Sequence, residues 1–232
     1  MHLNKFKDLS IFFPCYNEEK NIPRLLENAL AVIASLVEDY QIIIVNDGSK
    51  DKTREVAESI ARQYNNIEVK THSINKGYGA ALRTGFLSSK KEWVFYTDGD
   101  NQFDINELSL LLPLTDKYDI VSGYRIDRKD SFVRKLNAGV FNLALFILFG
   151  LRIKDVDCAF KLYRREIFDK IEITSTGALV DAEILIKARK LGYRIGQIGV
   201  HHFPRIAGKQ TGANLKVIFR AFKEIIKLRV HI

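Results

Sequence analysis

The sequence contains little cysteine. Cys15 and Cys158 are the two thiols among 232 residues, too few for the disulfide framework of a small secreted domain. Residues 1–7 are polar and lead directly into a strand pattern, which is unlike a secretory leader. We therefore expect a reducing, cytoplasmic setting in which both thiols are buried and neither is bridged.

Long hydrophobic runs are also missing. A helix that crosses a bilayer needs about 20 consecutive apolar residues, and the nearest candidate, residues 140–151, is interrupted by Asn142 and Gly150. Its length suits a buried or interfacial helix. We expect any contact with a membrane to be peripheral.

Several common site motifs are incomplete. Gly77-Tyr78-Gly79 lacks the third glycine of a dinucleotide-binding loop because Leu82 stands there, and Gln210 replaces the hydroxyl residue that should follow Gly208-Lys209 in a P-loop. His201-His202 has no second ligand pair for zinc, and we expect it to end a strand. No nucleophile elbow or Ser/His/Asp order is present.

Positive charge, in contrast, is in excess. The 36 Lys and Arg residues against 28 Asp and Glu give a net charge of +8, which points to an anionic partner: nucleic acid, a phosphorylated small molecule or a membrane surface. With 47% hydrophobic and 28% charged residues the composition is that of a globular protein. The length fits one large domain, or one domain with an appendage.

Apolar runs of strand length alternate with stretches of helical periodicity. In the first hundred residues we expect strands at 9–13, 42–45, 67–71 and 93–97 and helices at 18–37, 52–64 and 80–88. Farther on we expect helices at 105–114, 141–149 and 180–191, strands at 119–122, 159–163 and 193–200, and a basic loop from 123 through Arg134. This order predicts an α/β fold with a Rossmann-like, mostly parallel sheet flanked by helices.

Each of the first four strands is followed by a loop with an acid or a glycine. These loops are Tyr16-Asn17-Glu18, Asn46-Asp47-Gly48, Asn75-Lys76-Gly77 and Asp98-Gly99-Asp100. Carboxyl ends of parallel strands share one edge of a sheet, so the four loops should converge there. Asp98 and Asp100 could then hold one divalent cation that also binds substrate phosphates. Taken alone, Asp-Gly-Asp could equally be an ordinary turn.

The four loops, in this order, resemble the motif set of family 2 glycosyltransferases with the GT-A fold. The resemblance is to polyprenyl-phosphate sugar synthases of the dolichol-phosphate mannose synthase kind, and it covers about the first 210 residues. It implies a GT-A catalytic domain at residues 1–207. Asn46 and Lys161 depart from the family, where many members have aspartate and arginine, and lysine cannot offer the bidentate fork of a phosphate clamp.

The resemblance also implies roles for individual residues. Pro14, Tyr16, Glu18, Asp47, Lys76 and Gly77 would line the pocket for the base and ribose of a nucleotide sugar, with Asp98 and Gly99 beside them. Asp98, Asp100 and Gln102 would hold Mg²⁺ or Mn²⁺ against the diphosphate. Arg125, Arg134, Arg205 and Lys209 would contact donor and acceptor phosphates, and Asp157 would orient the acceptor or accept a proton.

The function implied is inverting, metal-dependent transfer of a hexose from a nucleoside-diphosphate sugar, of the GDP-mannose or UDP-glucose type, to polyprenyl or dolichyl phosphate. Such a protein would lie on the cytoplasmic face of a membrane. A family 2 enzyme acting on a saccharide or another lipid is one alternative. A basic nucleic-acid-binding or regulatory module is another, but it does not explain four acidic or glycine-bearing loops on one edge, so we expect no nucleic acid.

Residues 208–232 form a separate basic segment. From 215 to 228, apolar residues recur at helical spacing. Beyond Gly208 the segment contains six Lys or Arg residues and one acid, Glu224. This pattern predicts an amphipathic helix that binds an anionic membrane surface or a partner, or packs on the domain like an ordinary helix. The apolar helix at 141–149 could receive the lipid or lie in a homo-oligomer interface. The chain is thus either a peripheral member of the family or part of a longer protein.

Overall fold

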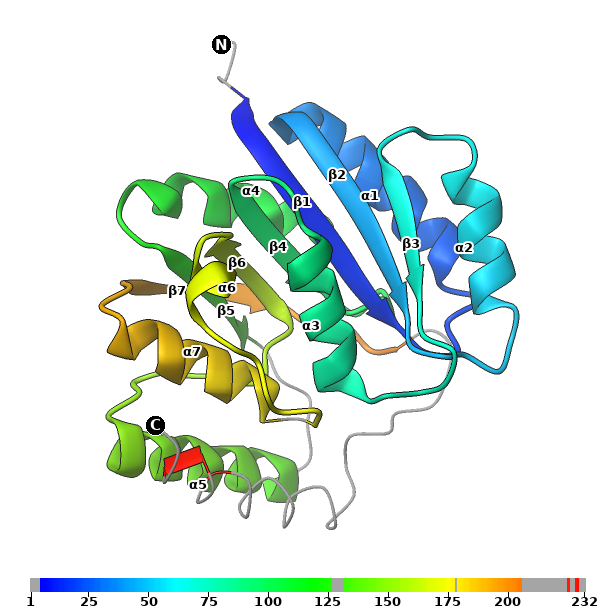
Figure 1. Cartoon of the computed structure of the whole chain (residues 1–232). Helices are drawn as coiled ribbons and strands as arrows, with labels where there is room; N and C mark the ends of the chain where they lie inside the picture. The colour runs from blue at the N-terminus through cyan, green and yellow to red at the C-terminus, as the bar shows by residue number, and fades with distance from the viewer. Residues whose placement is uncertain (1–4, 127–131, 178, 206–224, 226–227, 230–232) are drawn as a thin grey trace.

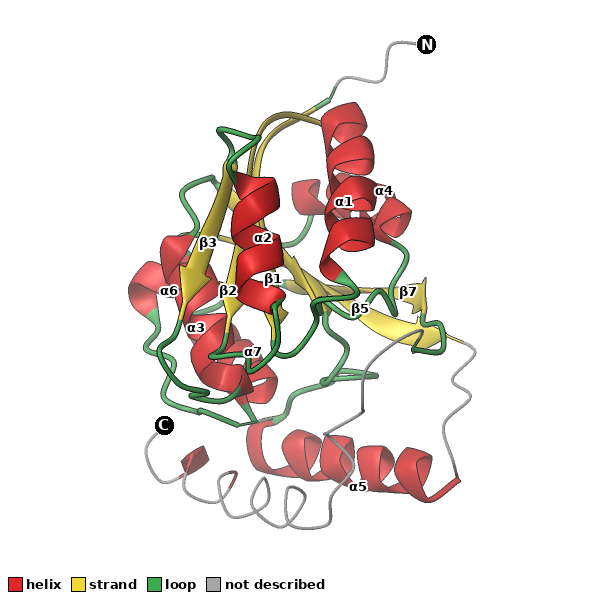
Figure 2. Ribbon diagram, turned by 90° about the vertical axis from the view of Figure 1, so that its right-hand side faces the viewer, coloured by secondary structure: helices red, strands yellow, loops and turns green. Residues whose placement is uncertain are grey.

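The computed structural model describes residues 5–126, 132–177, 179–205, 225 and 228–229, with the backbone alone for 132–138. Seven strands of this part of the chain form one sheet in the order β3-β2-β1-β4-β6-β5-β7 (Figure 1). The sheet carries helices on both faces (Figure 2). This is the α/β, Rossmann-like arrangement that the sequence predicts.

The strands are mostly parallel. Strands β1 (Phe6–Cys15), β2 (Val37–Asn46), β3 (Ile67–Thr71) and β4 (Trp93–Thr97) pair in parallel, as do β5 (Ile120–Ile126) and β7 (Ile195–His201). Strand β6 (Phe160–Arg164) lies between β4 and β5 and runs antiparallel to both. The carboxyl ends of the first four strands therefore meet at one edge, as expected from the crossovers.

Helices cover the sheet in two groups. One face carries α1 (Ile22–Leu36), α2 (Thr53–Ala61) and the turns η1 (Ile105–Glu107), α4 (Leu108–Leu111) and η2 (Leu112–Asp116). The other carries α3 (Tyr78–Ser88), α6 (Ile167–Lys170) and α7 (Val180–Lys190), with α5 (Phe132–Phe149) beneath α7 (Figures 1 and 2). In place of the predicted helix at 105–114 there are three short turns, and Pro113 lies at the start of the last one, where its missing amide hydrogen is tolerated.

The core has two halves, one on each side of the sheet. In β2, Ile43 and Val45 pack toward α3 while Ile42 and Ile44 pack toward α1, and all four are fully buried. Full burial on both faces explains why this strand shows no alternation of apolar and polar residues. Each such side chain contributes roughly 1.5–3 kcal/mol by leaving water.

Two predictions in the second half of the chain are wrong. Strand β5 continues through Gly123 to Ile126, because β7 pairs with it along that whole length. Helix α5 begins at Phe132 and therefore includes Arg134, which we had assigned to a basic loop. Arginine is a good helix former, and its charge alone gave no reason to begin the helix at residue 141.

No helix of the described residues is long and apolar enough to cross a membrane. Most of the predicted C-terminal helix, including Lys209, lies outside the described residues. Ile225 and Leu228 are described, and both are buried in the same half of the core as α3, α6 and α7. At these two positions the apolar face packs on the domain.

Candidate active site

The loops that follow β1, β2 and β4 are joined by hydrogen bonds. Asp47 donates its amide hydrogen to the carbonyl of Cys15 (2.9 Å), and Gly99 donates to Pro14 (3.4 Å). A side chain at position 99 would not fit, because its Cβ would lie 2.4 Å from the Cys15 sulfur. The predicted convergence of these loops is therefore present, and Gly99 permits it.

Asp47 attaches the loop after β3 to this group. Its carboxylate accepts the amide hydrogens of Lys76 and Gly77, each at 2.9 Å, and lies 2.6 Å from the ring of His72. Gly77 has a φ of 95°, and a Cβ there would lie 2.7 Å from the Thr176 carbonyl. The loop conformation thus requires glycine at this position.

Asp98 and Asp100 form a crowded pair of acids. Burial, and then the negative charge of Asp100, raise the pKa of Asp98 to about 7, although Tyr78 donates a hydrogen bond to it at 3.0 Å. Burial also raises the pKa of Asp100, against the hydrogen bond from the Gln102 amide and the charge of Arg205. Such a pair favours either a proton or a nearby cation.

These residues fit a metal ion that is shared with a phosphate ligand. The described residues contain no cluster of three or more His, Cys, Asp or Glu side chains that would form a closed metal site. Mg²⁺ in phosphate-binding enzymes is typically held by one or two carboxylates together with substrate oxygens and water. Asp98 and Asp100 supply two carboxylates. The side-chain N–H of Gln102 donates a hydrogen bond to the carbonyl of Phe203 at 2.9 Å, which leaves the side-chain oxygen for a cation.

Arg205 reaches the acidic edge from the far end of the chain. Its guanidinium forms an ion pair with Glu18 and lies 3.8 Å from Asp100. Phe203 holds this segment in place by donating its amide hydrogen to the Gln102 carbonyl at 2.7 Å. Burial raises the pKa of Glu18, although Asn21 and Arg205 act to lower it.

Arg125 is committed to a neighbouring carboxylate. Its Nε and Nη2 donate to the two oxygens of Asp155 at 2.7 and 2.8 Å, and both side chains are almost fully buried. Burial lowers the pKa of Arg125, but the hydrogen bonds and charge of Asp155 outweigh it and the net shift is upward. Sequence reasoning assigned Arg125 to a phosphate and overlooked Asp155, whose alternation with Asp157 repeats that of Asp98 and Asp100.

Part of Asp157 is exposed, but the protein around its carboxyl group excludes water from it. This desolvation, followed by the charges of Asp181 and Asp155, raises the pKa of Asp157 to about 6. The positive charge of Lys161 acts in the opposite direction and lowers the pKa of Asp157. The Lys161 ammonium is fully buried and donates to Asp181 at 2.7 Å and to the Tyr96 hydroxyl at 3.2 Å. Lys161 departs from the family pattern and is a buried ion-pair partner of Asp181, so its ammonium is not exposed to a phosphate.

The structure brings most of the predicted site residues together. Pro14, Glu18, Asp47, Gly77, Asp98, Gly99, Asp100, Gln102 and Arg205 are joined by the contacts above, and Tyr16 and Lys76 lie on the same loops. Arg134 lies in α5, where its side chain is not described, and Lys209 falls outside the described residues. His72 and Tyr78 were missed. Their positions directly after β3 and at the start of α3 are the signals that could have identified them.

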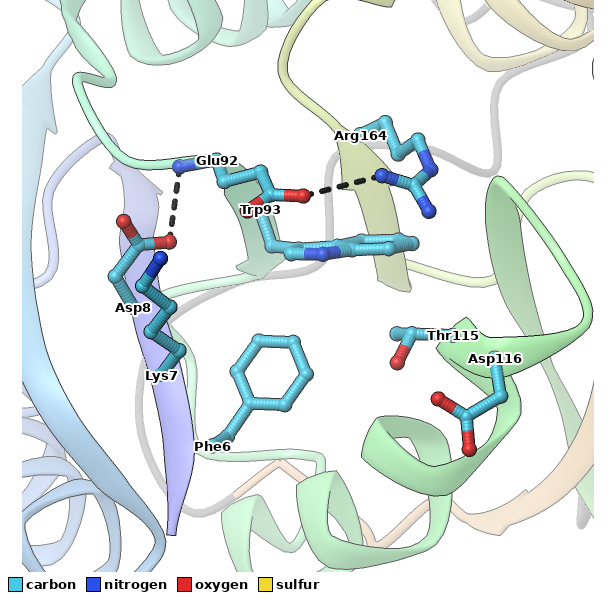
Figure 3. A pocket seen from close by; sticks show the side chains of 8 residues that line it. All are labelled: Phe6, Lys7, Asp8, Glu92, Trp93, Thr115, Asp116 and Arg164. Atoms are coloured by element: carbon cyan, nitrogen blue, oxygen red, sulfur yellow. Dashed lines mark hydrogen bonds and ion pairs between the residues drawn. The ribbon is translucent and has the colours of Figure 1, made fainter.

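A separate cavity of about 410 Å³ lies at the opposite ends of β1 and β4 (Figure 3). It is lined by Phe6, Lys7, Asp8, Glu92, Trp93, Thr115, Asp116 and Arg164. None of these residues is among the predicted site residues. The candidate site is therefore defined by its converging loops and not by this cavity.

Comparison with known proteins agrees with this assignment. Residues 10–172 match the model of glycosyl transferase family 2. A dolichyl-phosphate beta-glucosyltransferase of Trichomonas vaginalis is 36% identical over 210 residues, which cover 83% of this chain and 64% of that protein. An undecaprenyl-phosphate 4-deoxy-4-formamido-L-arabinose transferase of Photorhabdus laumondii is 32% identical over 172 residues, which cover 73% of this chain and 53% of that protein. The chain thus spans less than two thirds of the length of either relative.

Solved structures share the fold. The glucosyl-3-phosphoglycerate synthase of Mycobacterium tuberculosis, crystallised with Mn²⁺, UDP and glucosyl-3-phosphoglycerate, superposes with a TM-score of 0.72 at 19% identity. The match covers 99% of this chain and 81% of that one. With a seven-stranded, mostly parallel sheet and the four loops at its edge, the chain belongs to glycosyl transferase family 2 and has the GT-A fold.

Proposed function

We propose that this chain transfers a hexose from a nucleoside-diphosphate sugar to a polyprenyl phosphate, with inversion at the anomeric carbon. The observation that carries the proposal is the Asp98 and Asp100 pair, placed where four strand-end loops are bonded together. Two relatives are named for transfer to dolichyl and undecaprenyl phosphate, which supports the acceptor class.

In this proposal the donor lies across the four loops. Pro14, Tyr16, Glu18, Asp47, Lys76 and Gly77 surround the base and ribose, and the diphosphate lies next to Asp98, Gly99 and Asp100. A divalent ion bound with the diphosphate would neutralise its charge and act as a Lewis acid. Arg205, 3.8 Å from Asp100, adds fixed positive charge for the departing diphosphate.

The acceptor phosphate attacks from the opposite side of the sugar. One phosphate oxygen forms a bond to the anomeric carbon as the bond to the diphosphate breaks, which inverts that centre. A phosphate monoester is largely dianionic at neutral pH because its second pKa is about 6, so no strong base is needed. We assign Asp157 to orienting the acceptor, and Arg134 and Lys209 to contacts with phosphates.

Helix α5 offers a surface for the lipid. Val140, Leu143 and Ile147 are 49%, 56% and 70% exposed and share one side of the helix by their spacing. Two cations lie just after the end of the helix. The guanidinium of Arg152 lies 5.3 Å from the ring centre of Phe146, and the ammonium of Lys154 lies 4.1 Å from that of Tyr124. Apolar residues next to positive charge suit an anionic membrane surface. We propose peripheral binding at the cytoplasmic face; a homo-oligomer interface is the competing use of the same face.

The test is a donor panel. The protein is incubated with UDP-glucose or GDP-mannose, Mg²⁺ or Mn²⁺, and a polyprenyl phosphate, and the product is identified by mass. We expect a hexosyl phosphate lipid from one donor. A parallel arm offers a soluble saccharide: product in that arm alone would replace the lipid acceptor with the alternative, and no product in either arm would contradict transfer from these donors.

A further inference from the structure

His72 connects three elements next to the proposed donor site. It follows β3, and its amide donates to the carbonyl of Asn46 at the end of β2 (2.9 Å). The Nδ1 of its ring lies 2.6 Å from the carboxylate of Asp47, and Nε2 lies 2.8 Å from the hydroxyl of Thr84 in α3. The side chain is 9% exposed. The ring is therefore held at both nitrogens.

The contact with His72 completes the environment of Asp47. One carboxylate oxygen of Asp47 accepts from the Lys76 amide and faces His72, and the other accepts from the Gly77 amide. Asp47 is 3% exposed, so a lost donor would not readily be replaced by water. The orientation of the carboxylate, and with it the course of the loop, depends on all three donors.

Thr84 allows the ring to keep both contacts whether it is neutral or charged. A neutral ring that donates from Nδ1 to Asp47 accepts the Thr84 hydroxyl hydrogen at Nε2. A protonated ring donates at both nitrogens, and the hydroxyl then accepts, because a hydroxyl can do either. The contacts of both ring nitrogens therefore hold the ring in one orientation.

We propose that His72 is a positioning residue of the donor site: it holds Asp47 against Lys76 and Gly77, so that the loop after β3 is preformed for a nucleoside diphosphate. The inference rests on the proposed function, which places the donor at this loop. Groups that orient a binding group through a hydrogen bond commonly influence affinity without touching the ligand.

A purely structural role is the competing explanation, because β3 is an edge strand whose partner within the described part of the chain is β2 alone. The backbone bond from His72 to Asn46 serves that role and survives any substitution of the side chain. The two roles can therefore be separated by replacing the ring while following both stability and nucleotide affinity.

The experiment is calorimetric titration of the chain with UDP and with GDP in the presence of Mn²⁺. His72→Ala should weaken binding of the preferred nucleotide about tenfold or more, from the loss of a hydrogen bond to a buried carboxylate. His72→Asn should restore most of the affinity, because its amide nitrogen stands at the place of Nδ1. His72→Gln should not restore the affinity, because its amide nitrogen lies near the place of Nε2.

A matched control is His201→Ala. His201 ends β7, the opposite edge strand, and its Nδ1 also lies within hydrogen-bond distance of a carboxylate, that of Glu107. This variant should bind nucleotide like the wild type. Equal affinity of His72→Ala and the wild type would overturn the inference, as would equal weakening of the Ala, Asn and Gln variants in step with a lower Tm. A wild type that binds neither nucleotide would overturn the proposed function, and this inference with it.

Discussion

The two ends of the sheet hold similar residues in opposite electrostatic states. At the cavity end, Arg164 lies 3.1 Å from Glu92 (Figure 3) and 3.3 Å from Asp119, so these two acids share a cation. Burial acts to raise the pKa of Asp119, but the bonds and charges of Arg194 and Arg164 lower it overall. At the site end, burial and Asp100 raise the pKa of Asp98 to about 7.

This difference identifies the functional end better than shape does. The cavity lies at the end where Glu92 and Asp119 are paired with Arg164. The loops at the other end keep like charges together, which costs folding free energy and persists where a ligand or ion compensates. Substitutions at the two ends of the sheet test this contrast.

Removing the buried cation beneath the site should have the largest effect. Lys161→Met leaves Asp181 without its ion-pair partner in the core, and we expect the free energy of unfolding to fall by about 3–5 kcal/mol. Chemical denaturation measures it. The double variant Lys161→Met with Asp181→Leu should recover much of the loss. A loss below about 1 kcal/mol in the single variant would show that the pair is unimportant for stability.

Neutralising one acid of the pair should abolish most activity. Asp100→Asn should lower hexose transfer by about 10²–10³-fold, the usual effect of removing a charge-stabilising group, while circular dichroism stays unchanged. Asp116→Asn changes an acid at the cavity end in the same way and should leave transfer intact. If both variants transferred equally well, the contrast between the ends would have no bearing on function.

The pH dependence of stability should differ between the ends. A carboxyl group whose pKa is higher in the folded chain than in the unfolded chain favours folding when it is protonated. Asp98, with a pKa of about 7, and Asp157, with a pKa of about 6, therefore stabilise the fold most when the pH is below their pKa in the unfolded chain. Their contribution to the free energy of unfolding declines as the pH rises toward 7. Without divalent ions we expect the free energy of unfolding to be about 3 kcal/mol higher at pH 5 than at pH 8, mostly from Asp98, because the exposed surface of Asp157 reduces its share. Calorimetric unfolding at the two pH values measures it.

Two controls separate this effect from other charges. Glu68, far from the acid pair, has a pKa lowered to about 2 by Lys90 and Lys70, so its stabilisation is complete above about pH 4.5 and is lost only below it. Asp98→Asn should flatten the change between pH 5 and 8, and Mn²⁺ should stabilise the wild type at pH 8. An unaltered slope in Asp98→Asn would contradict the assignment.

The smallest effect is expected at the cavity. Arg164 is about one third exposed, and its guanidinium also lies 4.7 Å over the ring of Trp93. Arg164→Met should cost no more than about 1 kcal/mol of unfolding free energy and leave transfer unchanged. Chemical denaturation measures the change in unfolding free energy, and the product assay measures transfer. A marked loss of transfer would show that the cavity takes part in the reaction.

Local pattern predicted the first half of the chain well. The strands expected at 67–71 and 93–97 coincide with β3 and β4, and Cys15 and Cys158 are buried and unpaired by disulfide. Local pattern gave a wrong boundary where pairing with a neighbouring strand sets the length of a strand. Strand β5 reaches Ile126 because it pairs with β7 along that length, and the sequence of residues 123–126 does not itself predict a strand.

The order of residues along the chain specifies which groups reach the site edge. Acids and glycines stand directly after apolar strands, and right-handed parallel crossovers bring such loops together. Which side chains meet depends on the folded arrangement. The pairs His72–Asp47, Arg125–Asp155 and Lys161–Asp181 are 20 to 30 residues apart in the chain, and Arg205 is 187 residues from Glu18. The strength of such pairs depends on distance in space and on burial, and local sequence contains neither.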